Sequence, residues 1–162
     1  MSVDRLAWTC LRQRRQPFLG IGVFAVVLQL GSNDLTDDRC TVNRFVAEYW
    51  GYIQYIRKRY LVRRVVVLEI LHRQESDRYP MNMTVAEYNR KVDSANSALK
   101  TRCARSINVI FWQHNRHVRL PAAISSDGVH MHANAMKHYW RSVRGAVMRV
   151  VRAVLTRRGV NP

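Results

Sequence analysis

The feature that most constrains this chain is a largely apolar stretch that ends in a short polar turn, Val23–Asp34, read as VFAVVLQLGSND. A run of this kind, closed by Gly31, is typical of a strand buried on both faces of a parallel sheet. The turn after such a strand lies at the carboxyl edge of the sheet, where open α/β folds bind their ligands. The stretch therefore predicts a strand over Val23–Leu30 and a candidate ligand-binding turn over Gly31–Asp34.

The residues before the turn allow a second interpretation. Basic Arg12–Arg15 followed by apolar Phe18–Leu30 resembles the charged and hydrophobic parts of a secretory signal peptide. The apolar run has thirteen residues, whereas a membrane-spanning helix needs about 20, and no small-residue cleavage pattern precedes the turn. We therefore expect a core strand rather than a leader, and no membrane span.

Strands and helices alternate along the rest of the chain. The pattern predicts these further elements: a helix from Asp37/Asp38 to Tyr60, a strand over Val65–Leu71, a helix opened by the capping box Thr84–Glu87, a strand over Ile107–Trp112, and a last helix from about His130 to Arg158. The buried stripe of the last helix is expected at Met136, Tyr139, Trp140, Val143, Val147, Val150 and Val154. Alternation of this kind is typical of β-α-β units and a parallel sheet. We predict one three-layer, flavodoxin-like α/β domain over residues 18–159, preceded by a basic arm over residues 1–17.

The charge balance is strongly basic. The chain has 27 Lys+Arg against 11 Asp+Glu, a formal net charge of +16, and such a balance attracts polyanions. Because most of the basic residues are scattered along amphipathic segments, solvated helix faces explain much of the excess. A non-catalytic basic module that binds nucleic acid is therefore kept as the alternative function. Cys10, Cys40 and Cys103 form neither a disulfide framework nor a metal-type pair, which favours a reducing, cytoplasmic compartment.

Two short motifs carry the candidate chemistry. In Asp127-x-x-His130, an ionised carboxylate beside an imidazole can fix the tautomer of the ring and stabilise the imidazolium. The Gly31 N–H and the Asn33 side chain could donate to a developing oxyanion, a role worth about 3–4 kcal/mol per donor. The structural alternative makes Asp127 an Asx-type cap beside a surface histidine, and Asn33 an ordinary turn residue.

Histidines gather in the C-terminal third. His114-x-x-His117 and His130-x-His132 have spacings that zinc sites use, but no cysteine or glutamate partner has supporting spacing. We therefore expect no metal and no cofactor. His114 and His117 lie in the long connection Gln113–Asp127, and contact with a substrate is the functional role we predict for them.

The two motifs together resemble the SGNH (GDSL-like) hydrolase superfamily. Gly31-Ser32-Asn33-Asp34 matches its G-x-N-D block at the end of a strand, and Asp127-Gly128-Val129-His130 matches its D-x-x-H block before a long C-terminal helix. The likeness covers roughly residues 22–158. It implies a flavodoxin-like fold and a small-molecule ester or related acyl substrate. It also implies that Gly31 and Asn33 belong to an oxyanion hole, with His130 as the general base and Asp127 as its orienting acid.

The chain departs from that family on its N-terminal side. The family places its nucleophile in a G-D-S block after the first strand, and a further block supplies another glycine; neither occurs here. Ser2 is the only serine before the Gly31 turn, and Ser32 occupies a variable position of the turn. A His–Asp pair without a nucleophile has nothing to activate. We therefore expect a truncated or decayed hydrolase with little or no esterase activity by itself.

The absent first strand also has a structural consequence. In the family's sheet it would lie beside the strand predicted at Val23–Leu30. Without it, that strand is an edge with unpaired backbone groups, and we predict marginal stability, self-association or pairing with an absent segment.

Overall fold

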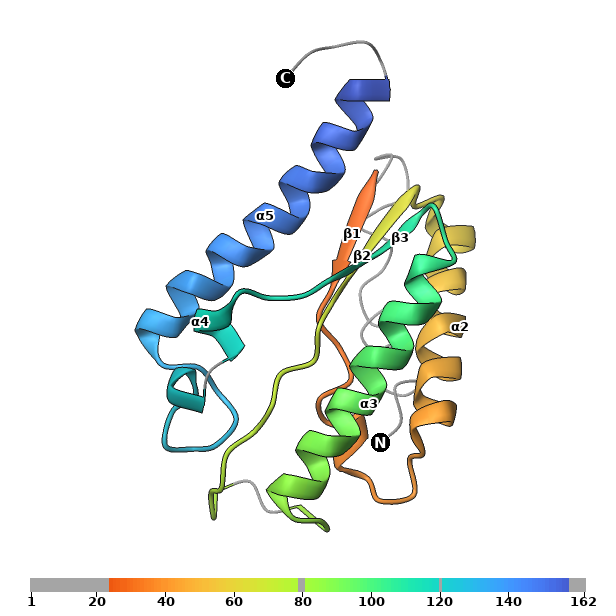
Figure 1. Cartoon of the computed structure of the whole chain (residues 1–162). Helices are drawn as coiled ribbons and strands as arrows, with labels where there is room; N and C mark the ends of the chain where they lie inside the picture. The colour runs from red at the N-terminus through yellow and green to blue at the C-terminus, as the bar shows by residue number, and fades with distance from the viewer. Residues whose placement is uncertain (1–23, 79–80, 120, 158–162) are drawn as a thin grey trace.

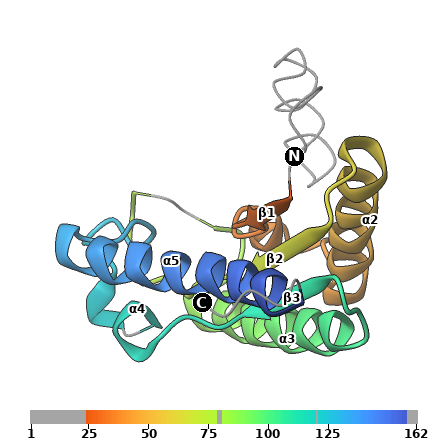
Figure 2. The same cartoon turned by 90° about the horizontal axis from the view of Figure 1, so that it is seen from above.

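The chain folds into a parallel sheet with helices on both faces. The computed structural model describes residues 24–78, 81–119 and 121–157, and Figure 1 shows their arrangement. The strands are β1 (Ala25–Leu28), β2 (Arg64–Leu68) and β3 (Val109–Trp112), and the helices are α2 (Val42–Tyr60), α3 (Val85–Ala104), α4 (Arg116–Arg119) and α5 (Ala133–Arg157), with 3-10 turns η1 (Asp34–Thr36) and η2 (Pro121–Ala123). The described strands pair in parallel in the order β1-β2-β3. Figure 2 shows α5 on one face and α2 and α3 on the other. The predicted α/β class is confirmed, while the arm over residues 1–17 and the chain after residue 157 lie outside the described residues.

The central strand β2 divides the core into two parts. Val65 and Val67 belong to the cluster packed against α2 and α3, whereas Val66 and Leu68 pack with residues of α5. This alternation follows from the two-residue period of a strand. The predicted strand over Val65–Leu71 ends earlier, at Leu68, and the third strand starts at Val109 rather than at Ile107.

Helix α2 ends where the sequence predicts, but it begins later. The prediction that Asp37/Asp38 cap this helix is wrong: the N-cap is Thr41, whose side chain accepts a hydrogen bond from the Arg44 N–H. Asp37 instead accepts hydrogen bonds from the backbone and guanidinium of Arg39. The helix closes at Leu61, which adopts the left-handed conformation with φ 54°.

Helix α3 follows the prediction closely. The Thr84 side chain accepts from the Glu87 N–H while the Glu87 carboxylate accepts from the Thr84 N–H, a complete capping box. The buried face of the helix consists of Tyr88, Val92, Ala95, Leu99 and Cys103.

Helix α5 begins at Ala133, and its buried face differs from the predicted stripe. The side chains buried against the sheet and the segment before the helix are the small residues Ala135, Ser142 and Ala146, together with Val150. Trp140 is 61% exposed, and Met136 and Val147 are exposed as well. The prediction of a buried stripe through these three residues is therefore wrong. Small side chains let the helix lie close to the sheet, and the larger apolar residues remain on its flank.

Strand β1 is an edge of the sheet in the described part of the chain. It pairs with β2 alone. Its first three residues are half-buried and only Leu28 is buried, so the predicted burial on both faces is wrong for most of the strand. The predicted edge position is what the described residues show. No helix among them is long and apolar enough to cross a membrane.

Candidate active site

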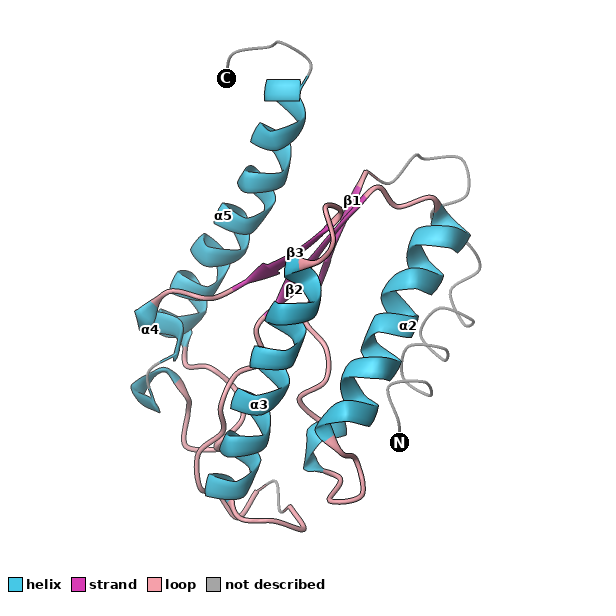
Figure 3. Cartoon of the chain, turned by 45° about the vertical axis from the view of Figure 1, so that its right-hand side comes forward, coloured by secondary structure: helices cyan, strands magenta, loops and turns pink. Residues whose placement is uncertain are grey.

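The segments that follow the strands meet at the carboxyl edge of the sheet. The Gly31 turn follows β1, residues 69–78 follow β2, and residues 113–132 follow β3. Because the strands are parallel, all three segments leave the sheet on the same side. Figure 3 shows this side, where the loops lie at the ends of the strands. Both predicted motifs belong to these segments.

The Asp127–His130 motif forms a closely bonded pair. His130 Nδ1 lies 2.7 Å from Asp127 Oδ2. Asp127 Oδ1 accepts hydrogen bonds from the N–H groups of His130 and Val129 and from the Ser125 hydroxyl, at 2.8, 3.0 and 2.7 Å. These donors, with the His130 N–H first, hold the pKa of Asp127 well below its usual range. The carboxylate thus stays ionised beside the ring, as the acid of an acid–base pair must.

The same hydrogen bonds also make the motif an Asx turn. The acid–base pair and the Asx-type cap, which the sequence offered as alternatives, are therefore both present in this loop. The carboxylate organises the loop through backbone donors, and it orients the imidazole through its second oxygen. The His130 side chain is 65% exposed and that of Asp127 is 14% exposed. The ring therefore reaches a molecule in solvent, while its orienting group is shielded.

The Gly31 turn depends on its glycine. Gly31 has φ +102°, and a Cβ at this position would lie 2.4 Å from the Phe45 ring. Its carbonyl accepts a hydrogen bond from the Leu35 N–H at 3.1 Å, which folds the chain into η1. The residue is buried, so the structure gives it a packing role. Donation from its N–H to an oxyanion stays a prediction.

The Asn33 side chain is oriented by an arginine that the sequence did not single out. Arg73 Nη2 donates to Asn33 Oδ1 at 2.7 Å and to the Ser32 hydroxyl at 3.2 Å. Because the guanidinium donates to the carbonyl oxygen of the Asn33 amide, the Nδ2 group of that amide points away from Arg73. Asn33 is exposed, so this N–H donor can serve an incoming molecule, as an oxyanion role requires.

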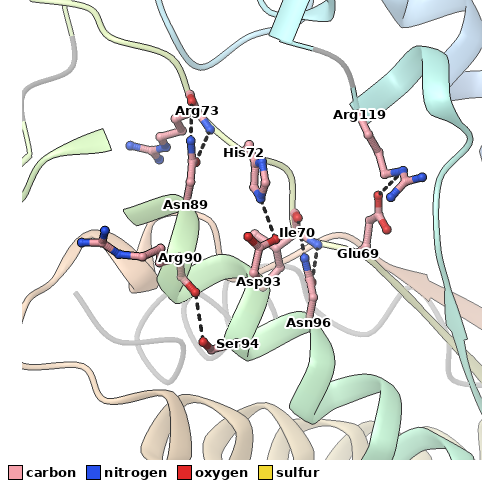
Figure 4. A network of polar contacts seen from close by, with 10 residues as sticks. All are labelled: Glu69, Ile70, His72, Arg73, Asn89, Arg90, Asp93, Ser94, Asn96 and Arg119. Atoms are coloured by element: carbon pink, nitrogen blue, oxygen red, sulfur yellow. Dashed lines mark hydrogen bonds and ion pairs between the residues drawn. The ribbon is translucent and has the colours of Figure 1, made fainter. Parts of the chain in front are cut away.

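Arg73 is itself held firmly. It is 7% exposed, and its guanidinium lies over the Tyr88 ring, 5.0 Å from the centroid. Its backbone N–H and carbonyl both bond to the side-chain amide of Asn89, at 2.9 and 3.0 Å. Asn96 clasps Ile70 in the same way, at 2.9 and 2.8 Å. Figure 4 shows both amides reaching from α3 to this segment.

The next residue, Gln74, joins this segment to the second motif. The Gln74 N–H donates to the Gly128 carbonyl at 2.9 Å. Gly128 has φ +74°, and a Cβ there would lie 2.4 Å from the Gln74 carbonyl oxygen, so the loops touch through backbone. The adjacent residues Arg73 and Gln74 therefore bond to the Asn33 turn on one side and to the loop of His130 on the other. The structure brings the two motifs together at one edge through this dipeptide.

Ser32, Ser125, Cys40 and Cys103 show no feature of an activated nucleophile. The Ser32 hydroxyl lies between Tyr88 Oη and Arg73 Nη2, at 3.0 and 3.2 Å, and the Ser125 hydroxyl donates to Asp127. Burial raises the pKa of Cys103 to about 11 and also raises that of Cys40, so both thiols stay protonated and unreactive. Ser2 and Cys10 lie outside the described residues.

Of the two loop histidines, His114 differs from its predicted role, and substrate contact stays a prediction for the exposed His117. His114 is 2% exposed, its Nδ1 bonds to the Ser142 hydroxyl at 2.9 Å, and burial lowers its pKa to about 4. It is a neutral core residue, and the predicted substrate contact is wrong for it. His117 stacks on His138 with the ring centroids 4.9 Å apart. No group of three or more potential metal ligands occurs in the described part of the chain.

A pocket of about 440 Å³ lies beside the dipeptide, between the end of β2, α3 and the segment around Arg119. Glu69 lines it, and burial raises the pKa of this carboxyl to about 7, although Arg119 lies 3.6 Å away and opposes the shift. His72 and Asp93 also line it, and His72 Nε2 lies 2.8 Å from Asp93 Oδ1 (Figure 4). No local sequence pattern predicts this pocket, because its walls come from segments far apart in the chain.

Comparison with known proteins places the fold but gives no family. No family model matches the sequence, and no curated protein matches it. A solved structure from Streptococcus pneumonia, provisionally described as a platelet activating factor, matches with a TM-score of 0.62 at 21% identity. The two chains share a fold. The match covers 76% of this chain and 59% of the other, so this chain spans less than two thirds of the length of that protein. At this identity, the match supports the α/β architecture alone.

Proposed function

We propose that this chain is the acid–base and oxyanion part of an SGNH-type ester hydrolase. The observation that carries the proposal is the Arg73–Gln74 dipeptide. It bonds to the Asn33 amide on one side and to the loop that holds the Asp127–His130 pair on the other. The proposal is supported because both sequence motifs that resemble the family lie in segments at the carboxyl edge of a parallel sheet and bond to the same dipeptide. The solved structure with the same fold supports the proposal at the level of the α/β architecture.

In the proposed reaction, His130 is the general base and acid. With its Nδ1–H donated to Asp127, Nε2 accepts the proton of a hydroxyl whose oxygen attacks the ester carbonyl carbon. The resulting oxyanion accepts hydrogen bonds from Asn33 Nδ2 and, as the family resemblance implies, from the Gly31 N–H. The carbonyl carbon then loses the alcohol, which takes the proton back from Nε2. Water repeats the sequence to release the acid.

The attacking hydroxyl is the part that this sequence does not provide in a G-D-S block. We therefore expect negligible turnover of p-nitrophenyl acetate by the 162-residue chain. Robust turnover that His130→Ala abolishes would show that a nucleophile is present and would contradict this expectation. Turnover that persists in His130→Ala would come from some other group on the surface.

The state of the acid–base pair can be measured without turnover. We expect ¹⁵N spectra of His130 near neutral pH to show the tautomer protonated at Nδ1, and Asp127→Ala to shift the ring toward the Nε2-protonated form that free imidazole side chains favour. Asn134→Ala, at an exposed position early in α5, is the matched control and should leave the spectrum unchanged. An Nε2-protonated ring in the unmodified chain would contradict the assigned role.

The oxyanion side can be tested with acetate, the product of acetate-ester hydrolysis. Titration should shift the side-chain amide signal of Asn33 together with the ring signals of His130, and Asn33→Ala should remove the His130 response. Arg73→Met should weaken the response as well, because the Asn33 amide is then free to rotate. Acetate shifts spread over surface arginines, with none at Asn33, would contradict a shared site.

A further inference from the structure

The outer edge of β1 is open among the described residues, although the strand is apolar. β1 pairs with β2 on one side only. Ala25 and Val27 face the α5 side of the sheet and remain half-buried, in contrast to Val65–Leu68 of β2, which are buried. An edge strand presents unpaired N–H and C=O groups to any chain that can align with it. This edge is therefore able to accept a further strand.

Helix α5 carries an exposed apolar stripe on the same side. Met136, Trp140, Val147 and Val151 recur at spacings of four, seven and four residues, and all four side chains are exposed. The opposite flank of α5 faces the other way: Gly145 lies against the Trp112 ring of β3, and His138 stacks on His117 of α4. On the near flank, the Tyr139 hydroxyl donates to Gln29 Oε1, just after β1, so the stripe lies on the β1 side of α5. Figure 2 shows α5 on the face of the sheet that it covers.

A row of basic residues borders this stripe. Lys137, Arg141 and Arg144 are exposed and follow one another at helical spacing, and Arg144 also lies one turn from Trp140. The sequence of α5 contains no aspartate or glutamate. An occupant of the stripe must therefore bring apolar side chains for the stripe and negative charge for its border.

These features select one class of occupant. A second copy of the chain, with its formal charge of +16, would set one basic border against another. Residues 1–17 carry four arginines and one aspartate, so their charge is also of the wrong sign. Nucleic acid and lipid headgroups would match the charge, but neither can form the ladder of backbone hydrogen bonds that a further strand forms with an edge.

We infer that the open edge of β1 and the apolar stripe of α5 form one docking surface for an acidic polypeptide segment. The segment adds a strand beside β1 and lays an amphipathic helix along Met136, Trp140, Val147 and Val151. Main-chain hydrogen bonds and a helix face would thus be recognised together. The inference does not depend on the proposed esterase function, because it concerns binding alone.

The test uses a synthetic peptide made of a short Val/Thr strand, a flexible Gly/Ser linker and a helix with a leucine stripe bordered by glutamates. The matched control peptide has lysine in place of each glutamate. We expect the acidic peptide to bind the full chain, to shift the Trp140 fluorescence to the blue and to slow hydrogen exchange of β1 amides. The lysine peptide should bind at least about tenfold more weakly, since its charge repels the basic row.

Variants of the chain locate the contact. Val147→Asp and Trp140→Gln replace exposed side chains, so folding should be retained, and each should weaken binding of the acidic peptide by about tenfold or more. Ile107→Gln is the control, because Ile107 is equally apolar and 79% exposed but lies before β3; its effect should stay within about twofold. Retained binding in Val147→Asp, or equal binding of the two peptides, would overturn the inference.

Other occupants give distinct results. Self-association that Val147→Asp removes, in a chain that ignores the acidic peptide, would identify a second copy as the occupant. Binding to vesicles containing phosphatidylserine or to an RNA oligonucleotide, without peptide binding, would identify α5 as a polyanion-binding surface. Each of these outcomes would overturn the inference as stated.

Discussion

The two faces of the sheet differ in how many side chains they bury and in how large those side chains are. On the α2/α3 side, large side chains such as Phe45, Tyr49 and Tyr88 are fully buried in one extended cluster. On the α5 side, the buried residues are few and small, with Ala146 and Val150 against Val66 and Leu68. Apolar burial drives folding roughly in proportion to area. The α2/α3 side therefore supplies most of the stability. The α5 side leaves apolar side chains of the helix exposed, where they are available for binding.

One half of the candidate site is supported by the α2/α3 side of the sheet and the other half by the α5 side. The Gly31 turn and Arg73 rest on the large cluster through Phe45 and Tyr88. The loop of His130 leads directly into α5 and is held mainly by hydrogen bonds. We expect destabilising substitutions on the α2/α3 side to unfold the chain. Substitutions on the α5 side should instead loosen the Asp127–His130 pair while the sheet stays folded.

The largest effect should come from Gly31→Ala. The new methyl group would collide with the Phe45 ring, and alanine at φ +102° is strained, so the free energy of unfolding should fall by about 3 kcal/mol. Urea unfolding followed by circular dichroism measures this. Gly51→Ala is the matched control: nothing lies within 4 Å of its Cβ position in α2, and alanine there should stabilise the chain by about 0.5–1 kcal/mol. Equal effects at the two glycines would contradict the packing role of Gly31.

A pair of valines in β2 compares the two faces directly. Val67→Ala opens a cavity on the α2/α3 side and Val66→Ala opens one on the α5 side, and both side chains are buried to within 1%. We expect a loss of about 2–3 kcal/mol for Val67→Ala, and about 1 kcal/mol less for Val66→Ala because the thinner α5 layer can collapse into the gap. Thermal and urea unfolding of both variants would measure the difference. Equal losses would show that the two faces are packed alike.

The pH dependence of stability should reveal two buried groups acting in opposite directions. Glu69 has a pKa raised to about 7 by burial, so the folded chain binds more protons than the unfolded chain between roughly pH 4.5 and 7, and the stability from this group falls as pH rises through that window. His114 has a pKa lowered by burial to about 4, so its contribution is lost as pH falls from about 6.5 towards 4. Glu69→Gln should remove the first slope and unmask the second. Urea midpoints at a series of pH values measure both, and an unchanged profile in Glu69→Gln would rule out this role for Glu69.

The smallest effect concerns the end of α2. Leu61 has φ 54° and is 81% exposed, so it pays the cost of a left-handed conformation without burying its side chain. Leu61→Gly should raise the free energy of unfolding by up to about 1 kcal/mol. The measurement is again the urea midpoint. A loss of stability would mean that the leucine makes a contact that outweighs its backbone strain.

Local signals in the sequence predicted the fold well. The capping box Thr84–Glu87 and the end of α2 at Tyr60 were correct because each depends on neighbours within one turn. The start of α2 was wrong because several residues before Thr41 have cap-forming side chains, and the choice among them depends on the surrounding turn. Asp37 bonds to Arg39 instead.

The errors on α5 and in the site have a common cause. Apolar residues cover two adjoining stripes of α5, and the sequence does not reveal that the smaller ones, Ala135 and Ala146, face inward. Arg73 was missed because its partner Asn33 is 40 residues away in the sequence. Contacts of that range depend on the pairing of the strands, which local patterns do not encode.

The two asparagines of α3 have a consequence for how the site is assembled. Asn96 and Asn89 lie seven residues apart, two turns of one helix, and each satisfies both the N–H and the carbonyl of a single residue in the segment after β2. A neighbouring strand would form the same backbone hydrogen bonds. The side chains of α3 therefore replace a strand at this point and keep the segment ordered beyond the last paired residue of β2. The spacing of a helix thereby sets the positions of Ile70 and Arg73, and through them the alignment of two loops that never meet in sequence.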